Sequence, residues 1–345
     1  MKTAVVVLNW NTKAYLRRFL PGLLSSCKQA GADLVVADSG SDDGSREVLQ
    51  KEFPEARTVL LDRNYGFTGG YNKAFEVLEG DGYDYFVLIN SDIEVDDGWL
   101  EPLLDWMESH PECGICGPKL HGLLRKGDDY ERISRFEYAG AGGGLLDRFG
   151  FPYCRGRIWK KVEQDRGQYD KCSPDVLWIT GACLLIRSSL WKQLGGLDDR
   201  FFAHMEEIDL CWRAQLAGWK VNVVPQSVVW HLGGGTLPPT SPLKLKLNFR
   251  NNLMALEKNL AGTYQTQGLS KEKAERKAAR FLRVRVYLDY CARIAYFCIG
   301  KPGLARAVRD AHREWKVLRN QAPAQQQPIP GAKVSGLTGI FILLK

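Results

Sequence analysis

No stretch of this sequence approaches the roughly 20 uninterrupted apolar residues that a membrane-spanning helix requires. The N-terminal MKTAVVVLNWN also lacks the charged segment, long apolar segment and small-residue cleavage site of a secretory signal peptide. The nine cysteines are scattered and odd in number, which favours reduced thiols over a disulfide framework. These absences predict a cytoplasmic protein.

Composition excludes several further classes of protein. The 345 residues are 45% hydrophobic and 25% charged, which is typical of a globular chain and excludes collagen, a coiled coil and a wholly disordered protein. The net charge of +7 is uneven, because residues 271–320 hold 14 Lys and Arg against 5 Asp and Glu. The basic character therefore belongs to the C-terminal segment.

Short runs rich in Val, Ile and Leu alternate with amphipathic stretches over residues 3–225, which predicts the strands and helices of an α/β fold. Ligands of open α/β sheets bind beyond the carboxyl ends of the strands, so polar residues there are the first candidates for a site. The expected strands are residues 3–8, 34–37, 58–61, 85–89, 114–117, 183–186 and 221–224.

Changes in composition predict the domain organisation. Residues 121–173 are rich in Gly, Arg, Asp and aromatic residues and are expected to form loops. The expected parts are an α/β domain over residues 1–240 with halves 1–120 and 121–240, a basic helical extension over 241–321 and a loosely ordered tail over 322–345.

Polar residues follow the first three expected strands. Asn9 and Asn11 end the first strand, and Asp38 ends the second before a turn rich in Gly and Ser. These side chains suit the edge of a base or a ribose, although a turn that caps the next helix is the simpler alternative. After the third strand, Arg63 and two glycines before a helix suit an anion. This segment is neither GxGxxG nor a Walker loop, so it supports neither a dinucleotide fold nor a P-loop ATPase.

Carboxylates and a histidine follow the later strands. The apolar run 85–89 leads directly to Asp92, which suits an oxygen ligand for Mg²⁺ or Mn²⁺, with a helix cap as the alternative. Three carboxylates lie between Glu206 and Asp209 where a helix should begin, and they suit a general base or the helix start itself. His231 ends the last apolar run and gains a functional role only if it folds beside Asp92.

Taken in chain order, these motifs resemble the family 2 glycosyltransferases, the inverting enzymes of the GT-A fold, and in particular their rhamnosyltransferase-like branch. The resemblance extends over residues 3–259, and the order of the motifs carries it. It implies a nucleotide-binding mixed sheet flanked by helices, a nucleotide-diphosphate sugar as donor, and Mg²⁺ or Mn²⁺ as cofactor. It assigns the donor to the first half of the α/β domain and the acceptor to the second.

The resemblance also implies roles for individual residues. Asp92 and His231 would hold the metal ion, with Asn90 standing where the family's DxD motif begins with aspartate. The residues implied to bind the donor are Asn9, Asn11, Asp38, Arg63, Asn64, Gly66, Asn72 and Asn90. Those implied to face the acceptor are Trp178, Gly181 and Glu206.

Glu207 stands where the family carries an aspartate as catalytic base. Glutamate has the same chemistry on an arm one methylene longer, and a displacement of about 1 Å costs on the order of 10²-fold in rate. We expect Glu207 to be the base, with Asp209 as the alternative. The implied reaction is a single displacement: the base takes the proton of an acceptor hydroxyl, the oxygen attacks C1, and the diphosphate leaves with inversion.

The function so implied is transfer of a sugar from a UDP-, GDP- or dTDP-linked donor to a glycan or lipid-linked acceptor in cell-surface polysaccharide synthesis. A non-catalytic nucleotide-sugar binding protein is an alternative, supported by the altered residues Asn90 and Glu207. A sugar nucleotidyltransferase is a further alternative, but Asn9-Trp10-Asn11 lacks its Gly-rich signature.

Zinc at His110, Cys113, Cys116 and His121 is not expected, because the two cysteines flank a strand and suit small apolar positions.

The basic C-terminal segment contains a helix with a wide apolar stripe. Arg285, Asp289 and Arg293 are expected on its opposite face. An apolar stripe in a basic segment suits the cytoplasmic face of an anionic inner membrane, with packing on the catalytic domain or on a second subunit as the alternative. Nucleic acid is not expected as a partner. The stripe comprises Phe281, Val284, Leu288, Cys291, Ala295 and Cys298, broadened by Val286, Tyr287, Tyr290, Ile294 and Phe297.

Overall fold

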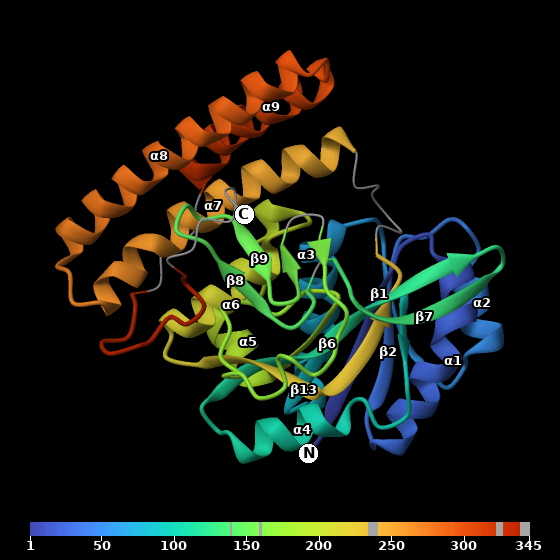
Figure 1. Ribbon diagram of the computed structural model, residues 1–345. Helices are drawn as coiled ribbons and strands as arrows, with labels where there is room; N and C mark the ends of the chain where they lie inside the picture. The colour runs from blue at the N-terminus through green and yellow to red at the C-terminus, as the bar shows by residue number, and fades with distance from the viewer. Residues whose placement is uncertain (139, 159–160, 234–240, 322–326, 339–345) are drawn as a thin grey trace.

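A twisted mixed sheet forms the centre of the molecule (Figure 1), with strand order β3-β2-β1-β4-β12-β6-β13-β5 and with β7 paired to β6. The structure is a computed structural model that describes residues 1–138, 140–158, 161–233, 241–321 and 327–338. The strands of this sheet are β1 Thr3–Asn9, β2 Asp33–Ser39, β3 Arg57–Leu61, β4 Tyr85–Asn90, β5 Ile93–Val95, β6 Cys113–Lys126, β7 Asp129–Phe136, β12 Cys183–Arg187 and β13 Lys220–His231.

The strands expected from the sequence are confirmed. The central strands are buried on both faces of the sheet, as their continuous apolar runs indicate. β1 lies parallel to both β2 and β4, and apolar side chains alternate along it between the two faces of the sheet. Ala4 and Val6 pack into one core, whereas Val5 and Val7 pack into the other. β12 runs antiparallel to β4 and β6, and this makes the sheet mixed.

Helices cover both faces of the sheet and complete three layers. The face that carries Val5 and Val7 is covered by α1 Lys13–Gln29, α2 Ser45–Glu52 and α4 Glu101–Ser109. The opposite face is covered by α3 Gly66–Leu78, α5 Ser188–Leu194 and α6 Glu206–Leu216. Short 3-10 turns lie at η1 Glu79–Asp81, η2 Asp199–Phe201 and η3 Arg319–Gln321.

The prediction that residues 121–173 form loops is wrong in part. β6 continues to Lys126 because β13 pairs along it as far as Gly122 and β7 returns against it as a hairpin. A second small sheet follows, and its glycine-rich start lets Gly144 lie against the Trp178 ring, where a Cβ would come within 2.0 Å. Its strands are β8 Gly144–Leu146, β9 Pro152–Cys154, β10 Arg157–Ile158 and β11 Lys161–Val162.

Three long helices follow the α/β domain and pack together on one side of it (Figure 1): α7 Pro242–Thr266, α8 Lys271–Cys298 and α9 Pro302–Leu318. The Ser241 side chain and Pro242 at the first helical position mark the start of α7. Residues 327–338 return to the domain, where Ile329 donates to the Leu216 carbonyl at 3.0 Å and Leu146 donates to that of Gly336 at 2.9 Å. The other residues of the expected tail, 322–326 and 339–345, lie outside the described residues.

Candidate functional site

The carboxyl ends of β1 and β2 bring Asn9 and Asp38 together, as expected from the sequence. The two residues are register partners, and the Asn9 side-chain nitrogen donates to Asp38 Oδ2 at 2.7 Å. Both side chains are fully buried, so they form a floor beneath the sheet edge. Asn11 lies exposed at the rim, where its amide exchanges two hydrogen bonds with Asp42.

Asp38 is held as a carboxylate. Arg46 Nε donates to its Oδ1 at 2.7 Å, and the Ser41 backbone N–H donates to the same oxygen at 3.1 Å. Burial raises the pKa of Asp38, but these donors and Asn9 outweigh burial and hold the pKa below its ordinary value. A negative charge therefore lies at the buried floor of this edge, with both carboxylate oxygens hydrogen-bonded within the protein.

The segment after β3 positions an exposed cation beside a tight turn. The Arg63 guanidinium is exposed and lies 4.9 Å from the centre of the Tyr65 ring. Asn64 Oδ1 accepts from the Gly66 backbone N–H at 2.8 Å. Gly66 has a φ of 70°, and a Cβ there would approach the Phe202 ring to 2.5 Å, so glycine is required at this turn.

The structure argues against direct donor binding by Asn72. Its amide nitrogen donates to the Leu197 carbonyl at 2.8 Å and to Asp199 Oδ1 at 2.7 Å, and its oxygen accepts from the Leu197 N–H at 2.9 Å. These bonds use both ends of the amide to anchor the loop before α6. Asn72 thus positions the second half of the domain.

Asp92 and His231 meet, as the sequence required for a functional histidine. The three-residue strand β5 begins just after Asp92, and it pairs with the end of β13 so that His231 opposes Ile93. His231 Nε2 lies 3.3 Å from Asp92 Oδ1 and 3.5 Å from the side-chain nitrogen of Asn90. The metal site implied by the sequence therefore has its two candidate ligands side by side.

The electrostatics of this pair suit a cation. Burial lowers the pKa of His231, but the carboxylates of Asp92 and Glu137 outweigh burial and raise it to about 10. Burial likewise raises the pKa of Asp92, and His231 reverses this and holds it below the ordinary value. Glu137 Oε1 lies 3.6 Å from His231 Nδ1, on the side away from Asp92.

The donor set fits Mg²⁺ or Mn²⁺ bound together with a diphosphate. A carboxylate and an imidazole are ligands that these ions accept, and Mg²⁺ usually takes one or two protein ligands plus phosphate oxygens and water. Among the described residues, no group of three or more His, Cys, Asp or Glu side chains is arranged to hold a metal ion alone. Asp92 and His231 would then share the ion with the donor.

Glu206 and Glu207 begin α6 directly after a strained turn in which His204 and Met205 have φ values of 69° and 72°. Burial and the adjacent Glu207 carboxylate raise the pKa of Glu206 well above its ordinary value. Burial also raises the pKa of Glu207, to about 7, against the lowering effect of backbone N–H donors. A carboxylate that ionises near neutral pH is suited to a general base.

Glu207 lies next to the segment that joins β12 to the metal site. A Cβ on Gly181 would lie 3.6 Å from the Glu207 Cβ, at ordinary van der Waals distance, so the two residues are direct neighbours. The next residue, Ala182, accepts a hydrogen bond from the Asn90 N–H at 2.9 Å. Gly181 and Ala182 therefore bridge the base candidate and the end of β4.

Asp209, the alternative base, is enclosed in an ion-pair cluster. Its Oδ2 accepts from Arg213 at 2.7 Å and from Lys258 at 2.8 Å, and its Oδ1 accepts from Asn259 at 2.9 Å. The carboxylate is fully buried, and its cationic partners outweigh burial and hold its pKa below the ordinary value. Both oxygens are occupied by structural partners, so the geometry favours Glu207 over Asp209.

Two of the residues expected to face the acceptor do not support that role. Trp178 is buried, its ring lies against Gly144, and its Nε1 donates to the Leu145 carbonyl at 3.2 Å. Glu206 is buried as well. Gly181 and Glu206 both adjoin the base candidate, Glu206 as its neighbour in the chain.

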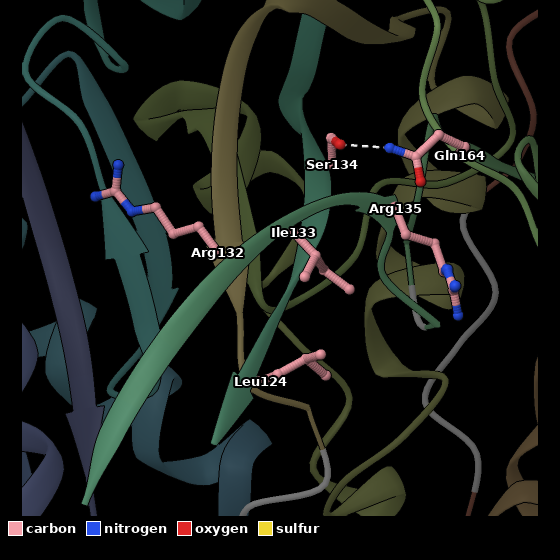
Figure 2. A pocket seen from close by; sticks show the side chains of 6 residues that line it. All are labelled: Leu124, Arg132, Ile133, Ser134, Arg135 and Gln164. Atoms are coloured by element: carbon pink, nitrogen blue, oxygen red, sulfur yellow. Dashed lines mark hydrogen bonds between the residues drawn. The ribbon is translucent and has the colours of Figure 1, made fainter. Parts of the chain in front are cut away.

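A hollow of about 400 Å³ lies elsewhere, against β7 (Figure 2). A hydrogen bond between Ser134 and Gln164 spans part of it. Within the described chain, none of the site residues expected from the sequence lines this hollow, so it is separate from the predicted site. Its lining residues are Leu124, Arg132, Ile133, Ser134, Arg135 and Gln164.

Sequence reasoning missed residues that support this site. Ser41 Oγ accepts from the Asn11 N–H at 2.9 Å, and Thr12 Oγ1 donates to Asn9 Oδ1 at 2.5 Å and lies 3.0 Å from Ser91 Oγ. Isolated hydroxyls carry little sequence signal. Their position beside the strand ends was the available clue.

Comparisons with known proteins identify the family of this chain. The sequence model of "Glycosyl transferase family 2" matches residues 4–192, more than half of the chain. The chain is 28% identical over 235 residues to the N-acetylglucosaminyl-diphospho-decaprenol L-rhamnosyltransferase of Mycobacterium tuberculosis, covering 66% of this chain and 75% of that protein.

Solved structures show the same fold. GalNAc-T7 with UDP, GalNAc and Mn²⁺ has a TM-score of 0.56 at 15% identity, over 85% of this chain and only 57% of that one. The mannosyltransferase of Pyrobaculum calidifontis with GDP-Man and Mn²⁺ has a TM-score of 0.50 at 13% identity, over 91% and 86%. With the motif order, the GT-A fold and the matched residues in agreement, this chain belongs to glycosyl transferase family 2.

Proposed function

We propose that this protein transfers a sugar, with inversion, from a nucleotide-diphosphate sugar to a hydroxyl of a lipid-linked glycan in cell-surface polysaccharide synthesis. The observation that carries the proposal is the contact between Asp92 and His231, joined through Gly181 and Ala182 to Glu207. The name of the mycobacterial relative supports L-rhamnose as the sugar and an N-acetylglucosaminyl-diphospho-polyprenol as the acceptor.

In the proposed reaction, Glu207 accepts the proton of the acceptor hydroxyl. The freed oxygen attacks C1 of the sugar while the bond from C1 to the diphosphate oxygen breaks, and the diphosphate leaves from the opposite face. Asp38 and Asn9 would hold the nucleoside, and Arg63 would reach the diphosphate. Asp92 and His231 would hold Mg²⁺ or Mn²⁺, which supplies electrostatic stabilisation of the leaving diphosphate.

The activity is tested directly with purified protein. UDP-, GDP- and dTDP-sugars, including dTDP-L-rhamnose, are incubated with a short-chain N-acetylglucosaminyl-diphospho-polyprenol and Mn²⁺, and product lipid is followed by mass spectrometry. We expect one donor to give a glycosylated lipid and Glu207→Gln to give none while still binding that donor. Release of pyrophosphate from a nucleoside triphosphate and a sugar phosphate would instead indicate a nucleotidyltransferase. Donor binding without transfer or hydrolysis would favour the non-catalytic alternative.

We further propose that α8 contacts the anionic membrane in which such an acceptor resides. Arg285 and Asp289 are buried: Arg285 Nε donates to Asn252 of α7 at 3.1 Å, and Asp289 lies 3.0 Å from His312 of α9. Arg285 and Asp289 thus point into the protein. Much of the apolar stripe points outward, whereas Phe281 and Val286 are partly buried against the core. The exposed apolar residues of this region are Val284, Tyr287, Tyr290, Ile294, Phe297 and Ile299.

Charge supports a membrane rather than a second copy of the chain. The outward side of α8 is basic in its first half and apolar in its second half, so it offers cations for lipid phosphates beside side chains for the acyl boundary. Two copies meeting on this face would bring like charges together. No helix among the described residues is long and apolar enough to cross a bilayer. The exposed cations of α8 are Lys271, Lys273, Arg276, Lys277, Arg280 and Arg283.

Vesicle sedimentation tests this contact. We expect binding to vesicles that contain phosphatidylglycerol and not to phosphatidylcholine alone. The double variant Tyr287→Asp, Phe297→Asp should release the protein, because the two side chains are 66% and 70% exposed and lie toward the two ends of the apolar half of α8. Val77→Asp on α3, 54% exposed, is the matched control. Equal sedimentation of both variants would refute the contact, and a monomer–dimer shift in the double variant alone would indicate a subunit interface.

A further inference from the structure

The turn between η2 and α6 is held in a conformation that its own sequence disfavours. Phe202, His204 and Met205 have φ values of 63°, 69° and 72°, in the left-handed region that residues other than glycine rarely adopt. Such strain persists only where surrounding contacts impose it. Glu207 follows this turn by two residues, so the path of the turn sets where its carboxylate lies.

Asn251 on α7 supplies these contacts. Its side-chain nitrogen lies 3.0 Å from the Phe201 carbonyl, 2.9 Å from that of Ala203 and 2.6 Å from that of His204, so its two N–H donors are shared among the three carbonyls. The side chain is 0% exposed. One amide group therefore holds three carbonyls around the strained turn close together. In a regular helix these carbonyls would not converge on a single group.

Arg250 fixes the orientation of that amide. Its Nε donates to Asn251 Oδ1 at 2.8 Å, so the nitrogen of the amide must point to the turn. Its Nη2 donates to the Phe201 carbonyl at 2.8 Å and to the Arg200 carbonyl at 3.1 Å. Glu314 of α9 in turn accepts from Arg250 Nη1 at 3.1 Å.

The opposite side of the turn is attached to the donor half. The Phe202 carbonyl accepts from the backbone N–H groups of Phe67 and Thr68, at 2.9 and 3.2 Å, at the start of α3. The turn is therefore held between α3 and α7, and Figure 1 shows α7 between the α/β domain and the outer helices α8 and α9. Removing one side leaves the other attached, so the turn would shift rather than detach.

We propose that Asn251 is a positioning residue that holds the turn before α6 and thereby places the Glu207 carboxylate for proton transfer. This inference rests on the proposed function for its kinetic readout, but the hydrogen bonds that carry it are independent of the substrate. It gives the first helix of the C-terminal extension a role in catalysis without contact with either substrate.

The adjacent Asn252 provides a matched control. It is also a buried asparagine of α7, only 4% exposed, but its side chain donates to the Gly150 carbonyl at 2.9 Å and accepts from Arg285. Asn251→Ala and Asn252→Ala thus remove the same group from the same helix. Asn251→Asp is a second variant that keeps an oxygen for Arg250 and removes the donors to the turn.

Kinetics and donor affinity separate positioning from folding. For Asn251→Ala and Asn251→Asp we expect kcat to fall about 100-fold, as for a base displaced by about 1 Å, with donor Kd changed less than about threefold. Asn252→Ala should keep kcat within about threefold at a temperature where all variants are folded. Equal losses in the two alanine variants, or a parallel loss of donor binding, would overturn the proposal.

Hydrogen exchange gives a readout that needs no activity. Amides of residues 202–207 should exchange at least about tenfold faster in Asn251→Ala than in wild type, and at the wild-type rate in Asn252→Ala. Unchanged exchange in Asn251→Ala overturns the inference even if the enzyme is active. If Asn251→Ala exchanges faster than wild type but wild-type protein transfers no sugar, the proposed function is refuted. Asn251 then keeps only its structural role, and the catalytic part of the inference is overturned.

Discussion

Sugar transfer should depend on pH through Glu207. The perturbation is a pH series on wild-type protein beside the Glu207→Gln variant. Burial raises the pKa of Glu207 to about 7, against backbone N–H donors that lower it. Because a base must be ionised to accept a proton, about a tenth of the molecules are competent at pH 6 and about nine tenths at pH 8. We expect kcat to rise about tenfold between these values.

The same shift makes a second, independent prediction about stability. The folded-state pKa of Glu207 lies above its ordinary value of 4.5, so the folded protein binds this proton more tightly than the unfolded chain does. The contribution of Glu207 to stability is therefore favourable at low pH and is lost as pH rises through about 4.5 to 7. Glu207→Gln removes this titration, so its free energy of unfolding should gain about 2 kcal/mol on wild type between pH 5 and pH 8.

Both parts can be measured on one set of proteins. Initial rates at saturating donor and acceptor give kcat from pH 5.5 to 8.5, and urea unfolding gives the free energy at pH 5 and pH 8. Glu275→Gln, which changes an exposed glutamate of α8, is the control and should match wild type in both. A flat kcat between pH 6 and pH 8, or full transfer by Glu207→Gln, would refute Glu207 as the base.

Three further variants test the surroundings of the base. Asp92→Ala should abolish the Mn²⁺-dependent part of donor binding and leave the metal-free part, as measured by calorimetry with and without Mn²⁺; unchanged dependence would exclude Asp92 as a ligand. Asp209→Asn should lower the free energy of unfolding by about 3 kcal/mol, because the buried Arg213 and the partly buried Lys258 lose their shared carboxylate, and an unchanged urea midpoint would contradict this. Gly66→Ala should cost about 2 kcal/mol and lower donor affinity, because its Cβ would lie 2.5 Å from the Phe202 ring at a φ of 70°; wild-type thermal stability would show that the turn adapts.

Much of the fold and part of the site could be predicted from the sequence. Continuous apolar runs identify strands buried on both faces, and the rule that parallel strands end at one edge brings Asn9 to Asp38. The sequence does not show whether Asp92 and His231 meet, so a functional role of His231 is expected only if they do. Their contact depends on the three-residue strand β5, which is too short to be recognised in advance.

Sequence spacing is silent about hydrogen-bond partners. Trp178 and Asn72 look available for a ligand in the sequence. In the structure the Trp178 ring packs against Gly144, and the Asn72 amide is hydrogen-bonded to the Leu197 backbone. Asp209 differs from Glu207 by its enclosure among Arg213, one turn further along α6, and Lys258 and Asn259 of α7. Asn251 left no distinct signal, because Arg250, Asn252 and Asn259 are further polar residues among the buried positions of the same helix.

The position of α7 has a consequence for how the enzyme can be divided. A fragment cut at the compositional boundary near residue 240 keeps every donor, metal and base residue expected from the sequence. It nevertheless loses the amide that shapes the turn and, with Lys258, a cation of the cluster behind α6. Truncations and chimaeras of this protein should therefore be cut or joined beyond residue 266, the end of α7, so that the α/β domain keeps the helix that supports the turn before α6.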